Sequence, residues 1–373
     1  MALLGDYLRH KAYWHEAIAA HTCALQTCRE LGDPARMARA SVALAGVRQE
    51  TGQHEVARQL AEDAAAMYRS LADRAGEAEA LDQVGMAYQR TARSREALAY
   101  FAEARILYHA AGDPRGVADT LSHSGIACWH LGRHPEASSH LAEALALYTA
   151  AGDRRGEAKA LNNLGRIHLY NGRYADALGA YHRSLLIFRE IGGAQNEAIL
   201  LHNIGTVHRC QGSYADGLAA CRQALEIYRE IGDLPNEADV LNDIGVIYAR
   251  AACPDEALAH HQRALLIAEE IGELSQRLVA LRGIADIRRG AGRYAEALAD
   301  YHTALRLARE IGDPYEEGKV LEGIAESTLS TPDSARIVFR QALDIFERLG
   351  VPEAETARTR VETIDPAFAA RVS

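Results

Sequence analysis

Residues 153–192 read DRRGEAKALNNLGRIHLYNGRYADALGAYHRSLLIFREIG. The stretch has apolar residues at helical spacing on each side of Asn171-Gly172-Arg173, and it closes on Ile191-Gly192. Glycine commonly ends helices because it adopts the left-handed conformation that a Cβ disfavours. The stretch therefore predicts two helices of about 15 residues joined by a short turn.

The same pattern recurs along the chain with a period of 40 residues. Ala72 stands in a column of closing glycines whose other members are Gly32, Gly112, Gly152, Gly192, Gly232, Gly272 and Gly312. The mid-unit glycines form a second column, Gly52, Gly132, Gly172, Gly212 and Gly292. The Asp that usually follows a closing glycine is expected to cap the next helix, because its carboxylate accepts from free N–H groups. A period of this length indicates a repeat protein.

Two further columns hold only small residues. In the first helix of each unit they are Gly5, Ala45, Gly85, Gly125, Gly165, Gly205, Gly245, Ala285 and Ala325, and in the second Ala17, Ala57, Ala97, Ala137, Ala177, Gly217, Ala257 and Ala297. Mid-helix glycine costs up to about 1 kcal/mol relative to alanine, so its repetition indicates two closely approaching backbones. An aromatic column is expected to pack between repeats: Tyr68, Tyr108, Tyr148, Phe188 and Tyr228.

Composition and motifs restrict the function. The net charge of −10 argues against a nucleic-acid ligand for this segment, because phosphate binding needs a basic stripe. There is no signal-like or membrane-spanning stretch, so we expect a cytoplasmic chain without membrane contact. The six cysteines lack ligand spacing and are expected to be small core residues. No cofactor, metal site or catalytic constellation is predicted, and we expect no enzyme activity.

The small-residue columns, Gly172-Arg173-Tyr174 and the recurring Glu-Ala-Leu of the second helices resemble tetratricopeptide repeats of the 40-residue type. This resemblance implies an all-α fold, a right-handed α-solenoid of tandem helical hairpins. We expect an incomplete first repeat over 1–31, eight repeats over 32–351, and a capping helix and tail over 352–373, in one continuous domain. The last repeat is two residues short, since Gly350 follows Gly312 by 38.

Several short phrases resemble a narrower family, the C-terminal repeats of actinobacterial AfsR-type regulators of the Streptomyces-antibiotic-regulatory-protein family. The phrases are Tyr7-Leu8-Arg9, Trp14-His15-Glu16-Ala17, Asp313-Pro314-Tyr315-Glu316-Glu317 and Leu349-Gly350-Val351-Pro352-Glu353-Ala354. This resemblance implies a sensor arm beside DNA-binding and NTPase domains. The first helix begins inside its own pattern at Met1, which suggests a preceding segment. Any ATPase or DNA-binding activity would lie outside this chain, which has no phosphate-binding loop.

The first helices are expected to line a concave groove that binds a peptide or protein segment. Side-chain amides both donate and accept, which suits an extended peptide backbone, and arginines suit acidic groups. The predicted groove residues are His123, Asn162, Asn163, Arg166, Tyr170, His202, Asn203, Arg209, Asn242, Asp243, Arg250, Arg282 and Arg289. Chaperone tails are not expected, because the lysines and asparagines of the carboxylate-clamp repeats are not in place.

Three alternatives stay open at this point. The chain is a free-standing adaptor, a solenoid that binds a small effector molecule, or a module that self-associates. Other domains of the same regulator are also candidate partners.

Overall fold

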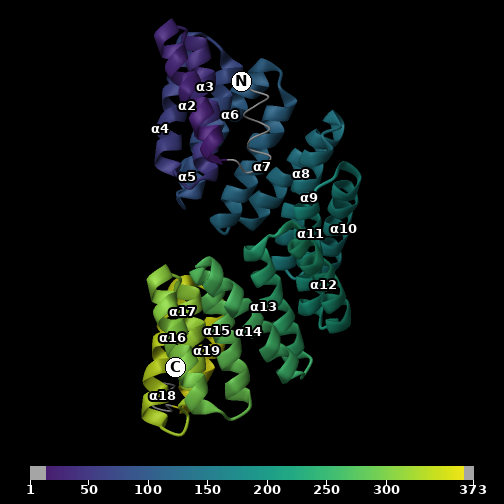
Figure 1. Cartoon of the computed structure of the whole chain (residues 1–373), viewed down its shortest axis with the longest axis vertical. Helices are drawn as coiled ribbons and strands as arrows, with labels where there is room; N and C mark the ends of the chain where they lie inside the picture. The colour runs from purple at the N-terminus through teal and green to yellow at the C-terminus, as the bar shows by residue number, and fades with distance from the viewer. Residues whose placement is uncertain (1–13, 365–373) are drawn as a thin grey trace. The chain divides into compact units, whose positions relative to one another are not determined.

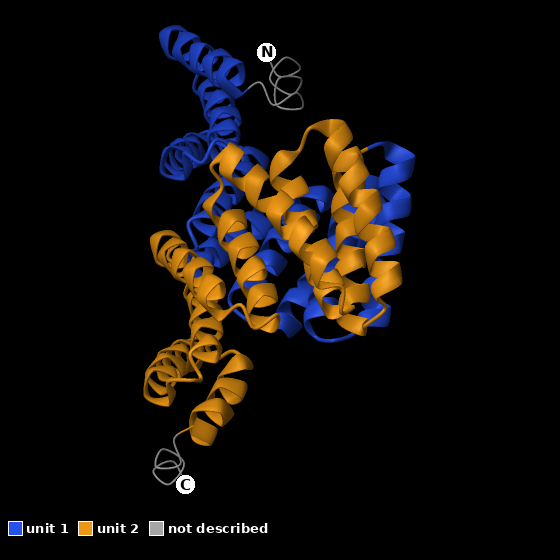
Figure 2. Ribbon diagram, turned by 60° about the horizontal axis from the view of Figure 1, so that its bottom comes forward, with its two compact units in different colours: residues 1–192 blue, residues 193–373 orange. Residues whose placement is uncertain are grey.

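The computed structural model describes residues 14–364. The predicted positions before Trp14, among them Gly5 and Tyr7-Leu8-Arg9, and the tail after Ile364 lie outside the described residues. Within the described range the chain is an all-α solenoid of helical hairpins (Figure 1). It divides into two compact units, residues 1–192 and residues 193–373 (Figure 2).

The helix bounds follow the 40-residue grid. In the first unit they are α2 (Trp14–Leu31), α3 (Pro34–Glu50), α4 (His54–Ser70), α5 (Arg74–Arg90), α6 (Ser94–Ala111), α7 (Pro114–His130), α8 (His134–Ala151), α9 (Arg154–Tyr170) and α10 (Tyr174–Ile191). In the second unit they are α11 (Ala194–Gln211), α12 (Tyr214–Ile231), α13 (Leu234–Arg250), α14 (Pro254–Ile271), α15 (Leu274–Gly290), α16 (Tyr294–Ile311), α17 (Pro314–Ser327), α18 (Pro332–Leu349) and α19 (Glu353–Ile364).

Each unit has two layers of helices. The odd-numbered helices α3 to α17 are the first helices of the repeats, and each packs on the even-numbered second helix that follows it. First helices of successive repeats also contact one another, as α5 does with α7 and α13 with α15. They therefore form a continuous layer within each unit, and the side chains on this layer are neighbours across repeats.

The predicted aspartate caps are present. Asp113 Oδ1 accepts from the backbone N–H groups of Arg115 and Gly116 at 3.1 and 3.0 Å, and Asp153 accepts from Gly156 at 2.9 Å. The equivalent cap occurs before α3, α5, α13 and α17. Because these side chains satisfy N–H groups that have no partner inside the helix, they fix where these six first helices begin, whereas α11 and α15 have no side-chain cap.

The mid-helix glycines are explained by the side chain that faces them from the second helix. A Cβ on Gly85 would lie 2.4 Å from Phe101 Cε1. Where the first helix has Ala45 instead, the corresponding residue of the second helix is Ala61, and both are buried in one cluster. Side-chain volume is therefore complementary at these two pairs. The equivalent pair Ala285 and Tyr301 differs, because the Tyr301 ring lies against Gly323 of the next first helix.

The close backbone approach predicted from the sequence is only part of this constraint. A Cβ on Gly205 would lie 3.2 Å from the Gly217 carbonyl oxygen but only 2.3 Å from Cys221 Sγ. The partner side chain therefore restricts the position more tightly than the partner backbone does.

The predicted aromatic column is buried between repeats, with Tyr68, Tyr148, Phe188 and Tyr228 at most 5% exposed; Tyr108 is half-buried. Three of the rings lie against glycines near the start of the next first helix, a pairing that the sequence analysis missed. The pairs are Tyr68 with Gly76, Tyr108 with Gly116 and Tyr148 with Gly156.

Two details differ from the sequence-based expectations or refine them. Cys23 and Cys210 are exposed, so they are not core residues, whereas Cys128 and Cys221 are buried as expected. The two residues missing from the last repeat shorten its first helix, because α17 has 14 residues where α15 has 17.

Ala252 occupies the turn position that is glycine in most other repeats, and its φ is 60°. Replacing it therefore tests whether this turn position favours glycine. A left-handed conformation costs alanine about 1–2 kcal/mol, and the greater unfolded-state freedom of glycine offsets part of the gain. We expect Ala252→Gly to raise the free energy of unfolding by about 0.5–1 kcal/mol in urea titrations. Ala259→Gly, at an exposed mid-helix position of α14, should lower it instead. If both changes altered the free energy of unfolding equally, the turn position of Ala252 would not favour glycine.

A double-mutant cycle tests the complementary volumes of Gly85 and Phe101. We expect Gly85→Ala to cost about 1–3 kcal/mol and Phe101→Ala about 3–5 kcal/mol in unfolding free energy. The double variant recreates the Ala45 and Ala61 pair, so its loss should be smaller than the sum by at least about 1 kcal/mol. Additive losses would show that the two positions do not constrain one another.

Candidate ligand-binding site on the first helices

Side chains on the first-helix layer form hydrogen bonds from one repeat to the next. His123 Nδ1 lies 2.9 Å from Asp82 Oδ1, and His202 Nε2 lies 2.9 Å from Asp243 Oδ2. In both pairs the partners are 41 residues apart, so they occupy adjacent columns of the grid in consecutive repeats. Three predicted groove residues, His123, His202 and Asp243, therefore bond to a side chain of the neighbouring repeat.

The pair in the second unit is part of a larger network. Thr206 Oγ1 donates to Asp243 Oδ2 at 3.0 Å, and Arg209 Nε lies 3.8 Å from Asp243 Oδ1. Burial alone would raise the pKa of Asp243, but the hydrogen bond and charge of His202 outweigh it and lower the pKa to about 2. Burial likewise favours the neutral form of His202, yet Asp243 raises its pKa.

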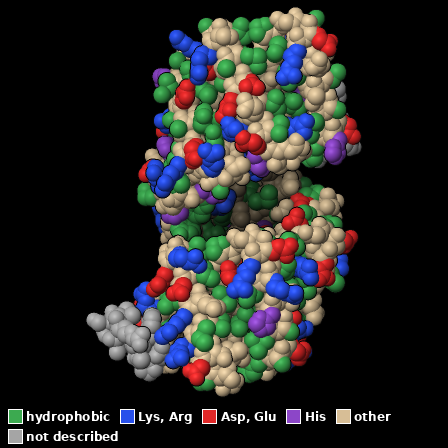
Figure 3. Space-filling view, turned by 90° about the vertical axis from the view of Figure 1, so that its left-hand side faces the viewer, with side chains coloured by type: hydrophobic (Ala, Val, Ile, Leu, Met, Phe, Trp, Pro, Cys, Tyr) green, Lys and Arg blue, Asp and Glu red, His purple; other side chains and the backbone are tan. Residues whose placement is uncertain are grey.

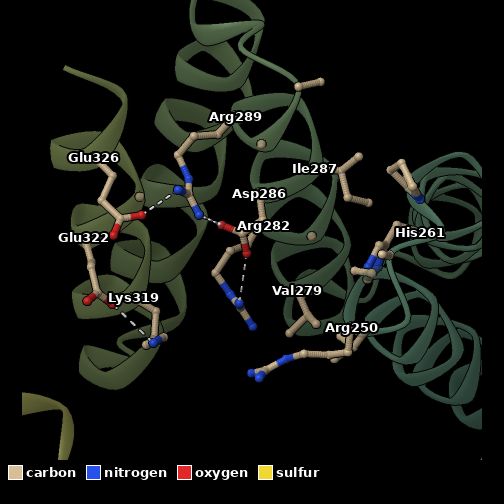
Figure 4. Close-up of a pocket in the computed structure, with 18 residues that line it drawn as sticks. Arg250, His261, Val279, Arg282, Asp286, Ile287, Arg289, Lys319, Glu322 and Glu326 are labelled. Carbon is tan, nitrogen blue, oxygen red and sulfur yellow. Dashed lines mark hydrogen bonds and ion pairs between the residues drawn. The ribbon is translucent and has the colours of Figure 1, made fainter. Parts of the chain in front are cut away.

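This arrangement changes at α15 because two glycines replace the polar column. Gly283 and Gly323 occupy the positions that Asp243 and His123 occupy in earlier repeats. A cavity of ≈ 760 Å³ opens between α13, α15 and α17, within the second unit (Figure 4). Its size falls in the usual range for ligand pockets, about 300–1,000 Å³.

Most charges around the cavity are already paired. Arg282 Nε lies 2.7 Å from Glu316 Oε2, Arg289 Nη1 lies 2.7 Å from Glu326 Oε2, and Lys319 Nζ lies 3.2 Å from Glu322 Oε2. These pairs span neighbouring helices or turns and hold the walls in position.

Arg250, at the end of α13, is the exception. Its side chain is exposed and has no ion-pair partner among the described residues. In the close-up it points into the same part of the cavity as Arg282 (Figure 4). An anionic ligand group would therefore meet an unneutralised guanidinium at this point.

His261 and Tyr301, both from second helices, lie at or directly beneath the surface of the cavity. They occupy the space that a Cβ would fill at Gly283 and at Gly323. A Cβ on Gly283 would lie 2.5 Å from His261 Cε1, and one on Gly323 would lie 2.4 Å from Tyr301 Cζ. Tyr301 donates its hydroxyl hydrogen to Asp286 Oδ1 at 2.5 Å and accepts from Arg289 Nε at 3.2 Å. Two lining residues, Asp286 and Arg289, are therefore bonded to a fully buried side chain of the core.

The structure corrects one predicted groove residue. Asn242 is only 3% exposed, and its Oδ1 lies 3.0 Å from His261 Nδ1. Its side chain points toward the second helix rather than to an open surface, because the small column of α13 and α15 makes room for His261 there. A backbone-clamping role for Asn242 is therefore not available in this structure.

The other predicted residues outside the cavity fall in two groups. Asn162, Asn163 and Asn203 are half-buried, whereas Arg166 and Tyr170 are exposed. Arg166 lies 6.0 Å above the ring of Trp129, which also contacts Tyr170 edge-on at 4.9 Å between ring centroids. All five stay candidates for ligand contact; Asn203 lies in the second unit and the other four lie in the first.

Sequence reasoning missed several residues that line or support the cavity, namely His261, Tyr301, Lys319, Glu322 and Glu326. A signal was present: the column that reads Gln83, His123, Asn163, Asn203 and Asp243 changes to Gly283 and Gly323. In a repeat protein such a break in a polar column indicates either a close approach or an opening.

The face drawn in Figure 3 and the residues that the structure describes add no charged patch and no metal site. Lys, Arg, Asp and Glu side chains are interspersed on the face in Figure 3, without a block of one sign. Residues 14–364 contain no cluster of three His, Cys, Asp or Glu side chains suited to a metal ion. None of the described helices has the length and apolar content that a membrane span requires.

A family model for the tetratricopeptide repeat matches residues 36–110, 76–150, 116–190, 156–215, 196–270 and 276–348. The chain belongs to the tetratricopeptide repeat family. The first five matched segments start 40 residues apart and overlap, and the sixth begins six residues after the fifth ends. A search of curated protein sequences found no match.

Solved structures share this tetratricopeptide repeat fold at low sequence identity. The apo form of the quorum sensor NprR from B. thuringiensis has a TM-score of 0.67 and 16% identity, with 92% of this chain and 99% of that chain covered. A Signal Transduction ATPase with Numerous Domains (STAND) protein with a tetratricopeptide repeat sensor, from Pyrococcus horikoshii, has a TM-score of 0.62, 15% identity and coverage of 93% and 55%. A Rap protein complexed with Competence and Sporulation Factor has a TM-score of 0.57, 14% identity and coverage of 90% and 99%.

The His202 and Asp243 pair predicts a pH-dependent stability of this repeat protein. Because the folded pKa of His202 is raised, the charged ring stabilises the fold fully below about pH 6.5. That contribution is lost as the pH rises through the raised value. We expect Asp243→Asn to lower the unfolding free energy by about 1.5–3 kcal/mol at pH 6, and by less at pH 9. Urea titrations at both pH values measure the difference.

Asp344→Asn provides the control, because Asp344 is an exposed residue in the middle of α18. This change should have little effect at either pH. A loss for Asp243→Asn that is the same at pH 6 and pH 9 would exclude a charged His202 as the partner.

Proposed function

We propose that this chain is a ligand-sensing interaction domain that binds a peptide or protein segment in the cavity between α13, α15 and α17. The observation that carries the proposal is the unpaired Arg250 at a cavity whose other charges are neutralised within the walls. A fixed network with one free charge can hold a ligand group without first breaking an internal ion pair.

The lining also suits a peptide. Val246, Val279 and Ile287 supply apolar surface beside the charged groups. Pockets that bind ligands typically combine apolar walls with a few polar groups in fixed positions. An extended segment could place apolar side chains against these residues and a carboxylate against Arg250.

The sensing role is supported by two independent likenesses. The structures that share the fold include proteins described as a quorum sensor and as a STAND protein with a tetratricopeptide repeat sensor. The phrases around Asp313 and Leu349 resemble the C-terminal repeats of AfsR-type regulators. We therefore propose that the chain is the sensor arm of such a regulator and transmits ligand binding to an NTPase core.

The same proposal specifies where the domain acts and that it acts by binding alone. A sensor arm of a transcriptional regulator acts in the cytoplasm through binding, without catalysis of its own. The partners are a peptide or protein segment and other domains of the same regulator, and nucleic acid is contacted by a separate domain.

A charge reversal tests the cavity. Peptides selected from a random display library on the full chain should lose at least about tenfold in affinity with Arg250→Glu, a loss of roughly 1.4 kcal/mol. Arg263→Glu is the matched control, because Arg263 is an exposed arginine on the second helix α14. We expect it to leave affinity unchanged in fluorescence anisotropy titrations.

Two outcomes would contradict the proposed site. Selected peptides that bind equally well to both variants would place the binding surface elsewhere. A selection that yields no binding peptide, together with binding of a small effector, would favour the small-molecule alternative.

A further inference from the structure

His261 belongs to the second-helix layer, yet its ring is part of the cavity lining. The side chain is 2% exposed and lies between two first helices. A Cβ on Gly245 of α13 would lie 2.7 Å from His261 Nε2, and one on Gly283 of α15 would lie 2.6 Å from the same atom. The ring reaches the cavity because both flanking residues are glycines.

The protonation of the ring is set by its neighbour. His261 Nδ1 lies 3.0 Å from Asn242 Oδ1, and because a carbonyl oxygen can only accept, Nδ1 carries the hydrogen. Burial, with a further contribution from the Arg282 charge, lowers the pKa of His261 to about 4. The ring is therefore neutral near pH 7, and Nε2 presents a lone pair.

That lone pair has no hydrogen-bond partner among the described residues. Nε2 is not fully buried, because the residue borders the cavity, so a donor on a ligand can reach it there. Asn242, which fixes the ring, is itself buried with an unpaired Nδ2. The Asn242 and His261 pair therefore stabilises the fold less than two apolar side chains at these positions would.

Packing does not require histidine at this position. The other residues of the column in the described repeats are His21, Ala61, Phe101, Leu141, Tyr181, Cys221, Tyr301 and, in the shortened last repeat, Phe339. Phe101 and Tyr181 lie against Gly85 and Gly165 as His261 lies against Gly245. A phenyl ring in place of the imidazole therefore has two precedents in this chain.

We propose that His261 is a ligand-recognition residue, which accepts a hydrogen bond at Nε2 from an N–H of an acidic peptide segment whose carboxylate pairs with Arg250. This inference rests on the proposed function and specifies the class of ligand. An acidic segment is favoured by charge, because Arg250 is the lining cation whose charge no described carboxylate neutralises. The two contacts together select a peptide by its main chain and by one side chain.

Two mixture libraries of acetylated, amidated hexapeptides test the acidic preference with the full chain. One library has Glu fixed at the third and fourth positions, and the other has Lys there. We expect at least tenfold tighter binding of the Glu library, and Arg250→Gln should abolish this preference. Tighter binding of the Lys library would overturn the acidic ligand.

His261→Phe tests the hydrogen bond with the tightest peptide from the Glu library. We expect about fivefold weaker binding, which corresponds to the loss of one hydrogen bond. Tyr181→Phe is the matched control, since it removes a polar atom from the same column in the first unit, and it should change affinity by less than twofold. Wild-type affinity of a folded His261→Phe variant would overturn the role of His261.

A second readout does not depend on any substitution. In ¹⁵N spectra of the histidine rings, Nε2 of His261 should resonate as an unprotonated nitrogen and shift when the peptide is added. An unchanged Nε2 resonance in the saturated complex would overturn the hydrogen bond. If no peptide from either library binds, the proposed function fails as well, whereas binding without a contribution from His261 rejects this inference alone.

Discussion

The structure depends on a restriction of volume between the two helices of each repeat. A small residue in the middle of the first helix faces a side chain from the second helix, and the two cannot both be large. At Gly85 and Phe101 the second helix supplies the volume, and at Ala45 and Ala61 both residues are small. Because interiors are close-packed, a Cβ at 2.4 Å from a ring must displace that ring or the helix that carries it. The period of 40 residues repeats this restriction, and the caps and turns then fix where each helix begins and ends.

The same restriction produces the cavity. In three repeats a polar residue of one first-helix column bonds to the neighbouring repeat: Gln83 to Gln49, His123 to Asp82, and Asp243 to His202. At Gly283 and Gly323 this side chain is absent, and the space is taken partly by His261 and Tyr301 from the second helices and partly by the cavity. A substitution that removes a hydrogen bond between repeats thus opens a place for a ligand, and the core residues behind it become part of the lining. The tetratricopeptide repeat supplies the scaffold, and the irregular repeats supply the proposed site.

The sequence was sufficient for the repeat, because each landmark recurs in phase and each has a local physical cause. The aspartate caps and the buried aromatic column follow from short-range rules, and the structure confirms them for Asp113, Asp153 and Tyr228. The site was predicted less well. Helical spacing placed Asn242 on the exposed face, but burial of His261 between two glycines drew the amide inward. The inward position of the Asn242 side chain depends on residues of α13, α14 and α15 together. The residue pattern of a single helix therefore cannot predict it. Arg250 and Arg282 were predicted because they lie on the expected face of their own helices. Lys319 and Glu326 lie on α17, and only the packing of α17 beside α15 shows that they line the cavity.

A sensor needs a site whose occupation changes the energy of the surrounding repeats. For the proposed sensing role, the cavity offers ion pairs between α15 and α17 and two core residues in or beneath its lining, through which a bound ligand would act on these repeats. The most direct test of this account is a crystal structure of the full chain with a peptide selected by binding. The account predicts extended density between α13, α15 and α17, with a carboxylate at Arg250. Density for the peptide on the second helices, with the cavity empty, would contradict it.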